Sequence, residues 1–306
     1  MEADRLRKYP DPTASILVKE LASYYGLNED QVFVGVGSDD VLAMSFLTFF
    51  NSDKPVLFPD VTYSFYKVWA DLFKVPFETP VLKEDFTIDV KDYEKENGGV
   101  IFPNPNAPTG VYMPLDQVEE ILKANQDVVV IVDEAYVDFA GPSALELLDK
   151  YENLLVVQTF SKSRSMAGMR IGFAMGHPDL IRALNDVKYS YNSYTMNLPS
   201  LLAGVEAVKD KEYFEKTIEK IVATREHAKK RLTELGFTFP NSQSNFIFAS
   251  HKSVPAEKIF EALKKEQIYV RYFKTPGLDN SLRISIGTDE EMDTLFRFLE
   301  AYLPNA

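Results

Sequence analysis

Polar side chains follow two apolar segments in the middle of this chain, and their types could support covalent chemistry. Asp133 follows the apolar run at residues 128–132, and Ser161 and Lys162 follow the run at residues 154–159. A buried carboxylate is costly unless it meets a cation or a hydrogen-bond donor, so Asp133 is a candidate functional group. A lysine in an apolar pocket can form a Schiff base with an aldehyde. Taken singly, Asp133 could equally be an ordinary buried acid, and Lys162 is more simply explained as a surface lysine.

Two further segments could hold an anion or a ring. Residues 35–40, Gly-Val-Gly-Ser-Asp-Asp, form a turn that opens a helix, where backbone N–H groups can bind a phosphate. Ser38 or Asp39 can equally be the N-cap of that helix. Residues 103–110, Pro-Asn-Pro-Asn-Ala-Pro-Thr-Gly, form a rigid turn that can aim an asparagine amide such as that of Asn106 at little entropic cost. An ordinary Asn/Pro loop is the simpler explanation of this second segment.

Two arginines could bind an anionic group. Arg170 lies eight residues after Lys162, beside an apolar segment, and its planar guanidinium could reach the same pocket. Arg283 alternates with Leu282 and Ile284, so its side chain points to the opposite face of the predicted strand. That face is either solvated or holds a carboxylate or phosphate.

The elements that must position these residues alternate between short β-branched runs and helical patterns, which is typical of parallel sheets joined by helical crossovers. Residues 128–132 are apolar on both faces, which predicts a strand in the middle of the sheet. Ligands bind beyond the carboxyl ends of such strands, where these polar residues lie. We predict strands at residues 31–36, 55–58, 100–102, 128–132, 154–159 and 171–175, and helices at 13–26 with Thr13 as the cap, 39–50, 64–73, 115–124 and 178–188.

The C-terminal third has a different pattern of predicted helices and strands. A long charged amphipathic stretch at residues 201–235 is followed by predicted strands at 245–249, 267–273 and 281–286, with helices at 256–265 and 290–302 between and after them. This pattern predicts a smaller α+β domain. We therefore expect an N-terminal segment at residues 1–28 that packs with the small domain and a partner subunit, a large domain at 29–200, and a small domain at 201–306.

Composition excludes several classes of protein. The chain has 33 Lys and Arg against 46 Asp and Glu, a formal net charge of −13, which repels nucleic acids and anionic lipids. The absence of cysteine excludes disulfides and thiolate chemistry, and the three histidines are not at metal-ligand spacing. The N-terminus lacks the apolar core of a signal peptide, and no segment has the ~20 apolar residues that span a bilayer. We expect a cytoplasmic protein that binds neither nucleic acid nor membrane and no metal.

The order of these motifs resembles the fold type I aminotransferases, which use pyridoxal phosphate (PLP). An Asn-rich turn is followed by a strand-end Asp, a Ser-Lys pair, a Gly-x-Arg and a distant arginine. Within that group the chain is similar, from about Tyr9 to its C-terminus, to the histidinol-phosphate aminotransferase family. The segments that carry the similarity are Tyr-Pro-Asp-Pro at 9–12, Gly-Ser-Asp at 37–39, residues 103–110, Asp-Glu-Ala-Tyr-Val-Asp-Phe at 133–139 and Ser-Lys at 161–162.

The resemblance implies the fold and a role for each candidate residue. The fold would be a mostly parallel, seven-stranded sheet sandwiched by helices, with a smaller C-terminal domain. Lys162 would bind PLP covalently and move the substrate proton, Asp133 would pair with the ring nitrogen, and Tyr136 would bond the ring hydroxyl. The resemblance also implies that Asn106 bonds that hydroxyl, Tyr63 stacks on the ring, and Ser38, Asp39, Ser161 and Arg170 hold the cofactor phosphate.

The resemblance extends to the substrate and the partner. Arg283, with Arg271, would bind the phosphate of histidinol phosphate or the carboxylate of glutamate. Tyr191 and Asn192 match a substrate-pocket segment, although Ser190 stands where proline is common. Tyr9 would complete the phosphate site of a second subunit, which implies a homodimer.

Three features depart from the family pattern. Members usually carry a longer N-terminal arm, with an Asn-Glu-Asn-Pro segment near the substrate, than the eight residues that precede Tyr9 here, which leaves full substrate affinity open. Ala107 stands where many aminotransferases have the asparagine that contacts the ring oxygen, so we assign that role to Asn106. Arg164 stands where small residues are usual, and we expect it to point to solvent.

The resemblance therefore implies transamination between L-histidinol phosphate and 2-oxoglutarate, which gives imidazole-acetol phosphate and glutamate. A related enzyme acting on aromatic or other amino acids is one alternative, since Tyr63, Tyr66 and Tyr191 could accept a phenyl ring. A PLP-binding regulatory module without turnover is another. A nucleotide-binding domain is a poor explanation because residues 35–37, Gly-Val-Gly, lack the third glycine of the dinucleotide fingerprint.

Overall fold

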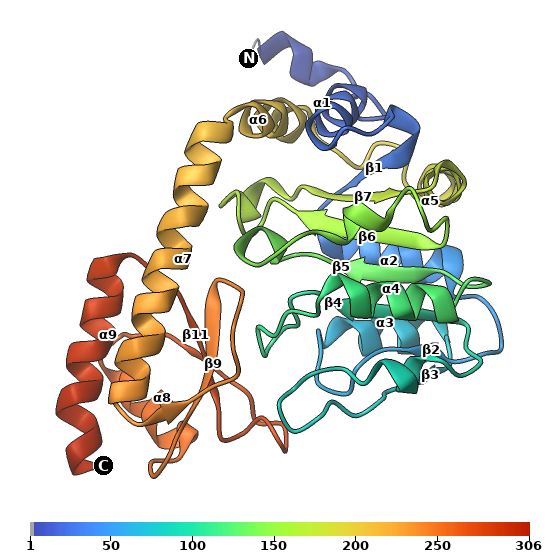
Figure 1. Ribbon diagram of the computed structural model, residues 1–306. Coiled ribbons are helices and arrows are strands. Elements are labelled where there is room, and N and C mark those ends of the chain that lie inside the picture. Colours follow the sequence, from blue (N-terminus) through green and yellow to red (C-terminus); the bar gives the residue numbers. More distant parts are fainter. Residues whose placement is uncertain (1–2) are drawn as a thin grey trace.

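The core of the protein is a seven-stranded sheet, seen in the computed structural model, which describes residues 3–306 (Figure 1). The strand order is β1-β7-β6-β5-β4-β2-β3, and only β7 runs against the others. β5 lies in the middle, as its apolar run predicts, so the expected mostly parallel α/β sheet is confirmed. The strands are β1 Val32–Gly35, β2 Val56–Leu57, β3 Phe77–Glu78, β4 Gly99–Pro103, β5 Val130–Asp133, β6 Leu154–Thr159 and β7 Gly172–Gly176.

Helices cover both faces of this sheet because successive strand residues point to opposite sides. Val130 and Val132 pack with apolar residues of α1, α4 and α6, whereas Ile131 packs with those of α2, α3 and α5. The helices are α1 Ser15–Tyr25, α2 Ser38–Phe49, α3 Phe65–Phe73, α4 Leu115–Ala124, α5 Pro178–Tyr191 and α6 Leu198–Lys209. Short 3₁₀ helices are η1 Ala3–Arg7, η2 Glu29–Gln31, η3 Val90–Tyr93, η4 Val137–Phe139, η5 Ala144–Leu147, η6 Ala167–Met169 and η7 Leu303–Asn305.

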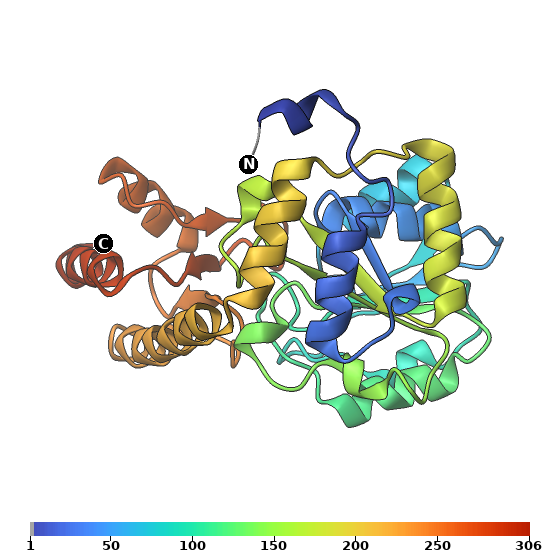
Figure 2. The ribbon, with the colours of Figure 1, turned by 90° about the horizontal axis from the view of Figure 1, so that it is seen from above.

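A smaller antiparallel sheet with its own core forms the C-terminal part, which lies to one side of the large sheet (Figure 2). Its strand order is β10-β11-β9-β8, and apolar residues of α7, α8 and α9 pack against it. Helix α7 runs from the large part into the small one (Figure 1). The elements are α7 Lys211–Glu234, β8 Phe237–Thr238, β9 Phe246–His251, α8 Ala256–Lys265, β10 Arg271–Tyr272, β11 Leu282–Ser285 and α9 Asp289–Tyr302.

Two expectations about helix ends were wrong. Ala14, in the left-handed conformation with φ of 52°, precedes α1, while Thr13 bonds the carboxylate of Asp11 instead of capping the helix. The predicted single stretch at 201–235 is two helices, since Asp210 ends α6 and its side chain accepts a hydrogen bond from Tyr213 N–H as the cap of α7. A capping carboxylate within an amphipathic run starts a new helix without interrupting the charge pattern.

The packing of α1 and α6 bears on where the two domains divide. Leu17 and Leu21 of α1 are fully buried in the core of the large sheet, so we propose that this helix belongs to the large domain, while Tyr24 of the same helix lies under the amine of Lys211 at the start of α7. Leu201 and Val208 of α6 lie in the same core. A boundary at residue 200 would divide α6, so we propose that the small domain begins at Asp210, between α6 and α7.

Candidate active site

One cavity of about 250 Å³ collects most of the predicted site residues. It lies where β4, β5 and β6 end and α2 begins, at the carboxyl edge of the sheet. Residues more than 120 positions apart, such as Lys162 and Arg283, share its wall. The predicted residues that line it are Ser38, Asp39, Tyr63, Asp133, Tyr136, Ser161, Lys162, Arg170 and Arg283, together with Pro103, Ala107, Ala135 and Ala167. We call this space the Lys162 cavity.

A row of side chains joins the two cationic ends of this cavity. The Nζ of Lys162 lies 5.3 Å from the centre of the Tyr136 ring, which meets the Phe246 ring edge to face at 5.0 Å. The guanidinium of Arg283 lies over Phe246 at 5.0 Å. The amine and the guanidinium are thus held on either side of two rings, and the Nε of Arg283 is buried without a hydrogen-bond partner among the described residues.

Asp133 is a buried carboxylate with unused acceptor capacity. Its Oδ2 accepts a hydrogen bond of 2.8 Å from the hydroxyl of Tyr66, and its Oδ1 accepts one of 3.2 Å from the N–H of Ala135. Burial raises the pKa of Asp133 to about 6, despite these hydrogen bonds. A cationic group in the cavity would reverse that shift, so the site favours a ligand with a protonated nitrogen at this wall.

The next residue, Glu134, is also buried, but other protein groups satisfy its carboxylate. Its carboxylate accepts hydrogen bonds of 2.6 Å from Ser143 Oγ, 2.6 Å from Ala144 N–H and 2.9 Å from Gln158 Nε2. Burial raises the pKa of Glu134 to about 7, but its partners are all supplied by the protein. Glu134 does not line the Lys162 cavity and ties neighbouring segments together, whereas Asp133 lines the cavity.

The start of α2 forms a cradle for an anion. Gly37 precedes the helix with φ of 86°, and no side chain caps the first-turn N–H groups. A Cβ on Gly37 would lie 2.5 Å from Nη2 of Arg170, so only glycine lets the guanidinium approach the turn this closely. Asp39 does not fill the cradle, because its carboxylate accepts a 2.8 Å hydrogen bond from the Tyr63 hydroxyl and lies 3.9 Å from Arg170. The same hydrogen bond and burial raise the pKa of Tyr63.

Asn106 is not brought into this cavity. Its Nδ2 donates hydrogen bonds of 3.0 Å to Val61 O and 3.0 Å to Thr109 Oγ1, and the side chain lines an adjoining cavity of about 260 Å³. The smaller Ala107 takes its place in the wall. The cis peptides before Pro105 and Pro108 belong to this turn. The arrangement gives no support to a direct contact of Asn106 with a bound ring, and that role stays a prediction.

The remaining predicted residues lie outside the Lys162 cavity. Arg271 is exposed but pairs directly with Arg283 in the β10–β11 ladder. Tyr9 is 81% exposed and stacks on Tyr194, with ring centres 4.5 Å apart. Tyr191, which is 82% exposed, and Asn192 lie at the C-terminal end of α5, and neither lines the Lys162 cavity.

The family described as Aminotransferase class I and II matches residues 2–299. The chain belongs to this family. This aminotransferase is 51% identical to the histidinol-phosphate aminotransferase of Brachyspira hyodysenteriae over 303 residues, which cover 99% of this chain and 86% of that protein.

A second relative and a solved structure agree. The histidinol-phosphate aminotransferase of Clostridium acetobutylicum is 54% identical over 292 residues, which cover 95% of this chain and 83% of that protein. The crystal structure of histidinol-phosphate aminotransferase from Sinorhizobium meliloti in complex with pyridoxal-5'-phosphate has a TM-score of 0.88 at 24% identity and covers 98% of this chain and 85% of that one. That likeness shows the shared fold.

Three residues of this aminotransferase have roles that the sequence did not reveal. Tyr66, expected as a pocket aromatic, is fully buried and holds Asp133. Phe246, between Tyr136 and Arg283, has no local motif because its importance depends on two domains meeting. Arg164 does not point to solvent: its guanidinium lies 4.1 Å from the centre of the Phe214 ring and donates a 2.7 Å hydrogen bond to Ala207 O. Phe160 and Phe214, whose rings lie beside the Arg164 guanidinium, are the sequence features that could have predicted this packing.

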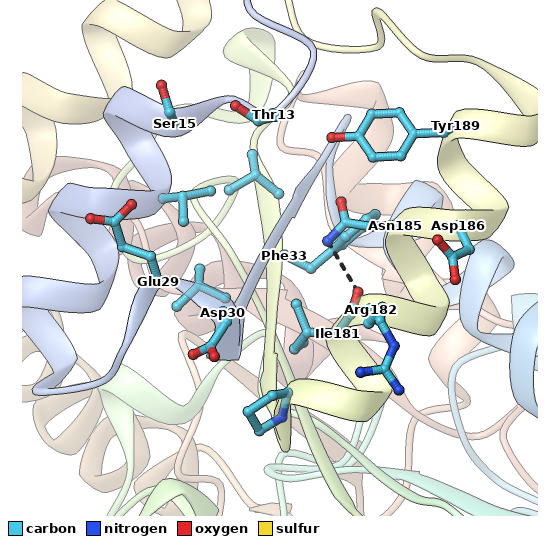
Figure 3. Close-up of a pocket in the computed structure, with 14 residues that line it drawn as sticks. Thr13, Ser15, Glu29, Asp30, Phe33, Ile181, Arg182, Asn185, Asp186 and Tyr189 are labelled. Carbon is cyan, nitrogen blue, oxygen red and sulfur yellow. Dashed lines mark hydrogen bonds between the residues drawn. The ribbon is translucent and has the colours of Figure 1, made fainter.

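A larger cavity lies elsewhere on the aminotransferase (Figure 3). It measures about 560 Å³ and is bordered by α1, β1 and α5. Its carboxylates Glu29, Asp30 and Asp186 outnumber its cation Arg182, which pairs at 2.9 Å with Asp179. None of the predicted site residues is among the described residues that line it. We call this space the α1–α5 cavity.

Proposed function

We propose that this chain is a PLP-dependent transaminase that exchanges an amino group between L-histidinol phosphate and 2-oxoglutarate, giving imidazole-acetol phosphate and glutamate. The observation that carries the proposal is the meeting of Lys162, Asp133 and Arg283 in one cavity of a chain 51% identical to a histidinol-phosphate aminotransferase. The amine suits an aldehyde, the buried carboxylate suits a ring cation, and the arginine suits an anionic substrate group.

The residues fit PLP at each of its functional groups. The cradle of Gly37, Ser38 and Arg170 suits the phosphate, because uncapped N–H groups at a helix start and a guanidinium converge there. Ser161 lies in the same wall. Asp133, whose pKa burial raises to about 6, suits a protonated ring nitrogen. Among the described residues, we find no cluster of His, Asp and Glu that could hold a metal ion.

When bound, PLP supplies an aldehyde for the amino group and a ring that accepts the electrons released as the substrate Cα loses its proton. Lys162 Nζ would hold the cofactor and then take the proton from Cα and return it. Asp133 would keep the ring nitrogen protonated, and Tyr136 would donate a hydrogen bond to the ring hydroxyl. The half-buried Tyr63 would stack on the ring while it holds Asp39.

Substrate binding would depend on the two paired arginines. Arg283 and Arg271 occupy directly opposed positions of an antiparallel ladder, where like charges repel unless an anion lies between or above them. A phosphate or a carboxylate offers a pair of oxygens to a guanidinium, so both substrates could use the same arginine. This accounts for an anion site in a chain whose net charge is −13. Tyr191 and Asn192 would contact substrate only if the end of α5 reached the Lys162 cavity of another chain.

The proposal includes a cytoplasmic homodimer in which Tyr9 contributes to the phosphate site of the other subunit. Tyr9 is too exposed to serve the Lys162 cavity of its own chain. An exposed apolar surface on α2 and α3, formed by Leu47, Phe65, Val68 and Leu72, is the kind of surface that a second copy would cover. Among residues 3–306, every helix is too short or too polar to cross a membrane.

A second candidate is transamination of aromatic amino acids. Arg283 is bordered by the rings of Phe246 and Phe273, which could pack against a phenyl group as well as against an imidazole. A phenyl substrate has no phosphate, however, and would leave one of the paired arginines without an anion. The observation therefore favours the phosphate-bearing substrate.

The test is a visible absorption spectrum of the purified protein, followed by borohydride reduction, peptide mapping and titration with amino donors. We expect a reduced adduct on Lys162 and loss of the absorbance band on addition of histidinol phosphate. A colourless protein that takes up no PLP would overturn the cofactor assignment. Faster turnover with phenylalanine than with histidinol phosphate would overturn the substrate assignment and support the second candidate.

A further inference from the structure

The two domains meet directly beneath the Lys162 cavity. Ala107, Tyr136 and Phe139 of the large domain form one buried cluster with Phe246 of the small domain, and Ile218 and Ile221 of α7 pack against it. The N–H of Gln243 also donates a 2.7 Å hydrogen bond to Gly110 O, at the end of the Asn/Pro turn. The relative placement of Lys162 and Arg283 therefore depends on this junction, because each is attached to one side of it.

Arg225 of α7 ties the two sides of the junction together. It is 6% exposed, and its Nη1 donates hydrogen bonds of 2.8 Å to Phe139 O and 3.1 Å to Ser244 O. Its Nε donates at 2.9 Å to Glu226, which balances the buried charge. Phe139 lies three residues after Tyr136, and Ser244 lies two residues before Phe246. One guanidinium nitrogen thus holds the backbone on both sides of the Tyr136–Phe246 ring pair.

From this geometry we infer that Arg225 is a positioning residue that sets the separation between the Lys162 amine and the Arg283 guanidinium, and so selects the length of substrate that can bridge them. The inference rests on the proposed function, because it concerns the same cavity. Arg225 does not line the cavity and acts through Phe139 and Ser244. A rigid planar donor suits this role, since it holds two carbonyl groups at a fixed distance from each other.

The chain offers a matched control on the same helix. Arg231 of α7 pairs with Glu300 and Glu234 and lies over the Phe296 ring at 5.2 Å, so all of these contacts are within the small domain. Replacing Arg231 removes a partly buried arginine without touching the junction. Arg225→Met and Arg231→Met therefore make the same chemical change, but only the first removes hydrogen bonds across the junction between the domains.

The experiment compares wild type, Arg225→Met, Arg225→Lys and Arg231→Met as full-length, PLP-loaded proteins. Amide hydrogen exchange reports on the junction at residues 136–140 and 242–246, and steady-state kinetics gives KM and kcat for histidinol phosphate. We expect Arg225→Met to accelerate exchange in both segments about tenfold or more and to raise KM about tenfold or more, with a smaller change in kcat, since an anion contact is misplaced and the proton transfer is not. Arg225→Lys, whose shorter side chain lacks the separate Nε donor to Glu226, should fall between, and Arg231→Met should match wild type.

The outcomes distinguish this inference from the proposed function. Exchange that accelerates in Arg225→Met while KM stays within about twofold of wild type would overturn the positioning role, as would unchanged exchange in both segments. If Arg225→Met does not fold, Arg225→Lys carries the same test with a milder change. If wild type does not act on histidinol phosphate, the proposed function fails, while exchange and the KM for the accepted amino donor still test Arg225.

Discussion

The Lys162 cavity and the α1–α5 cavity differ in how the polar groups of their walls are paired, and the proposed function places the chemistry in the smaller one. The α1–α5 cavity has a volume of about 560 Å³ and the Lys162 cavity about 250 Å³. In the larger cavity the hydroxyls of Thr13 and Ser15 donate hydrogen bonds to Asp11, and the carboxylates are exposed beside the edge strand β1. The Lys162 cavity lies at the carboxyl ends of the central strands, where charged groups are desolvated and lack a full set of partners. Incomplete hydrogen bonding of buried charge is therefore a better guide to a site than volume.

The largest effect is expected for Lys162→Ala. Removing the amine eliminates both the covalent attachment of the cofactor and the group that moves the proton, so turnover should fall by at least ~10⁴-fold. Single-turnover absorbance with histidinol phosphate measures the loss, and borohydride should leave no adduct in the peptide that contains residue 162. Retention of more than about one hundredth of the wild-type rate would contradict the assignment of Lys162.

Asp133→Asn should follow, with a loss of about 10²–10⁴-fold in kcat, because an amide cannot stabilise a ring cation as a carboxylate does. The matched control is Glu134→Gln, the residue directly after β5, which should keep the rate within about tenfold while it weakens the bonds to Ser143 and Ala144. Stopped-flow absorbance and PLP titration measure both variants. Equal losses in the two variants would show that burial alone, and not position, sets the importance of Asp133.

Arg283→Met should raise the KM for histidinol phosphate about 10–100-fold and leave cofactor binding unchanged, because the proposed function assigns the guanidinium to the remote anion of the substrate. The same variant should raise the KM for glutamate, since one arginine serves both. Initial-rate kinetics with each substrate measures the effect. A KM that changes for only one of the two would show that Arg283 and Arg271 divide the substrates between them.

The buried carboxylate of Asp133 should make the free energy of unfolding depend on pH in the cofactor-free protein. Burial raises the pKa of Asp133 from 3.8 to about 6, so in the cofactor-free protein the folded state holds a proton that the unfolded state releases. The contribution of Asp133 to the free energy of unfolding should therefore be largest below about pH 4. It should fall as pH rises toward about 6, by at most about 3 kcal/mol in total. Urea denaturation at several pH values should show a smaller fall in Asp133→Asn and in PLP-loaded wild type. An identical fall in both would rule out Asp133 as its source.

The smallest effect is expected in the α1–α5 cavity. Arg182→Gln removes the cation in its wall, which pairs with Asp179 at 71% and 63% side-chain exposure, and surface pairs of this kind contribute little. Activity, PLP affinity and the free energy of unfolding should match wild type within about 0.5 kcal/mol. A loss of activity in Arg182→Gln would remove the contrast between the two cavities.

Much of the site could be predicted from the sequence because it consists of short segments at strand ends. Residues that follow strands of one parallel sheet reach the same edge, so the turn at 37–39, Asp133, Tyr136 and the Ser161-Lys162 pair had to converge once the strands were recognised. The helix at 115–124 was predicted with its exact bounds, because its apolar and charged residues alternate at helical spacing. Asn106 was placed in the cavity for the same reason, but the turn directs its amide to Val61 instead.

The sequence by itself determined the family, the sheet and the set of groups at its carboxyl edge, since local patterns of apolar and polar residues specify strands, helices and turns. Tertiary structure alone decided which buried carboxylate lines the cavity, that Tyr66 holds Asp133, and that Phe246 and Arg225 join Tyr136 to the small domain. These contacts depend on the packing of elements up to 110 positions apart in the chain, from Tyr136 to Phe246. Side-chain direction and domain packing are fixed only when distant segments exclude water from the same space, and no local pattern encodes that.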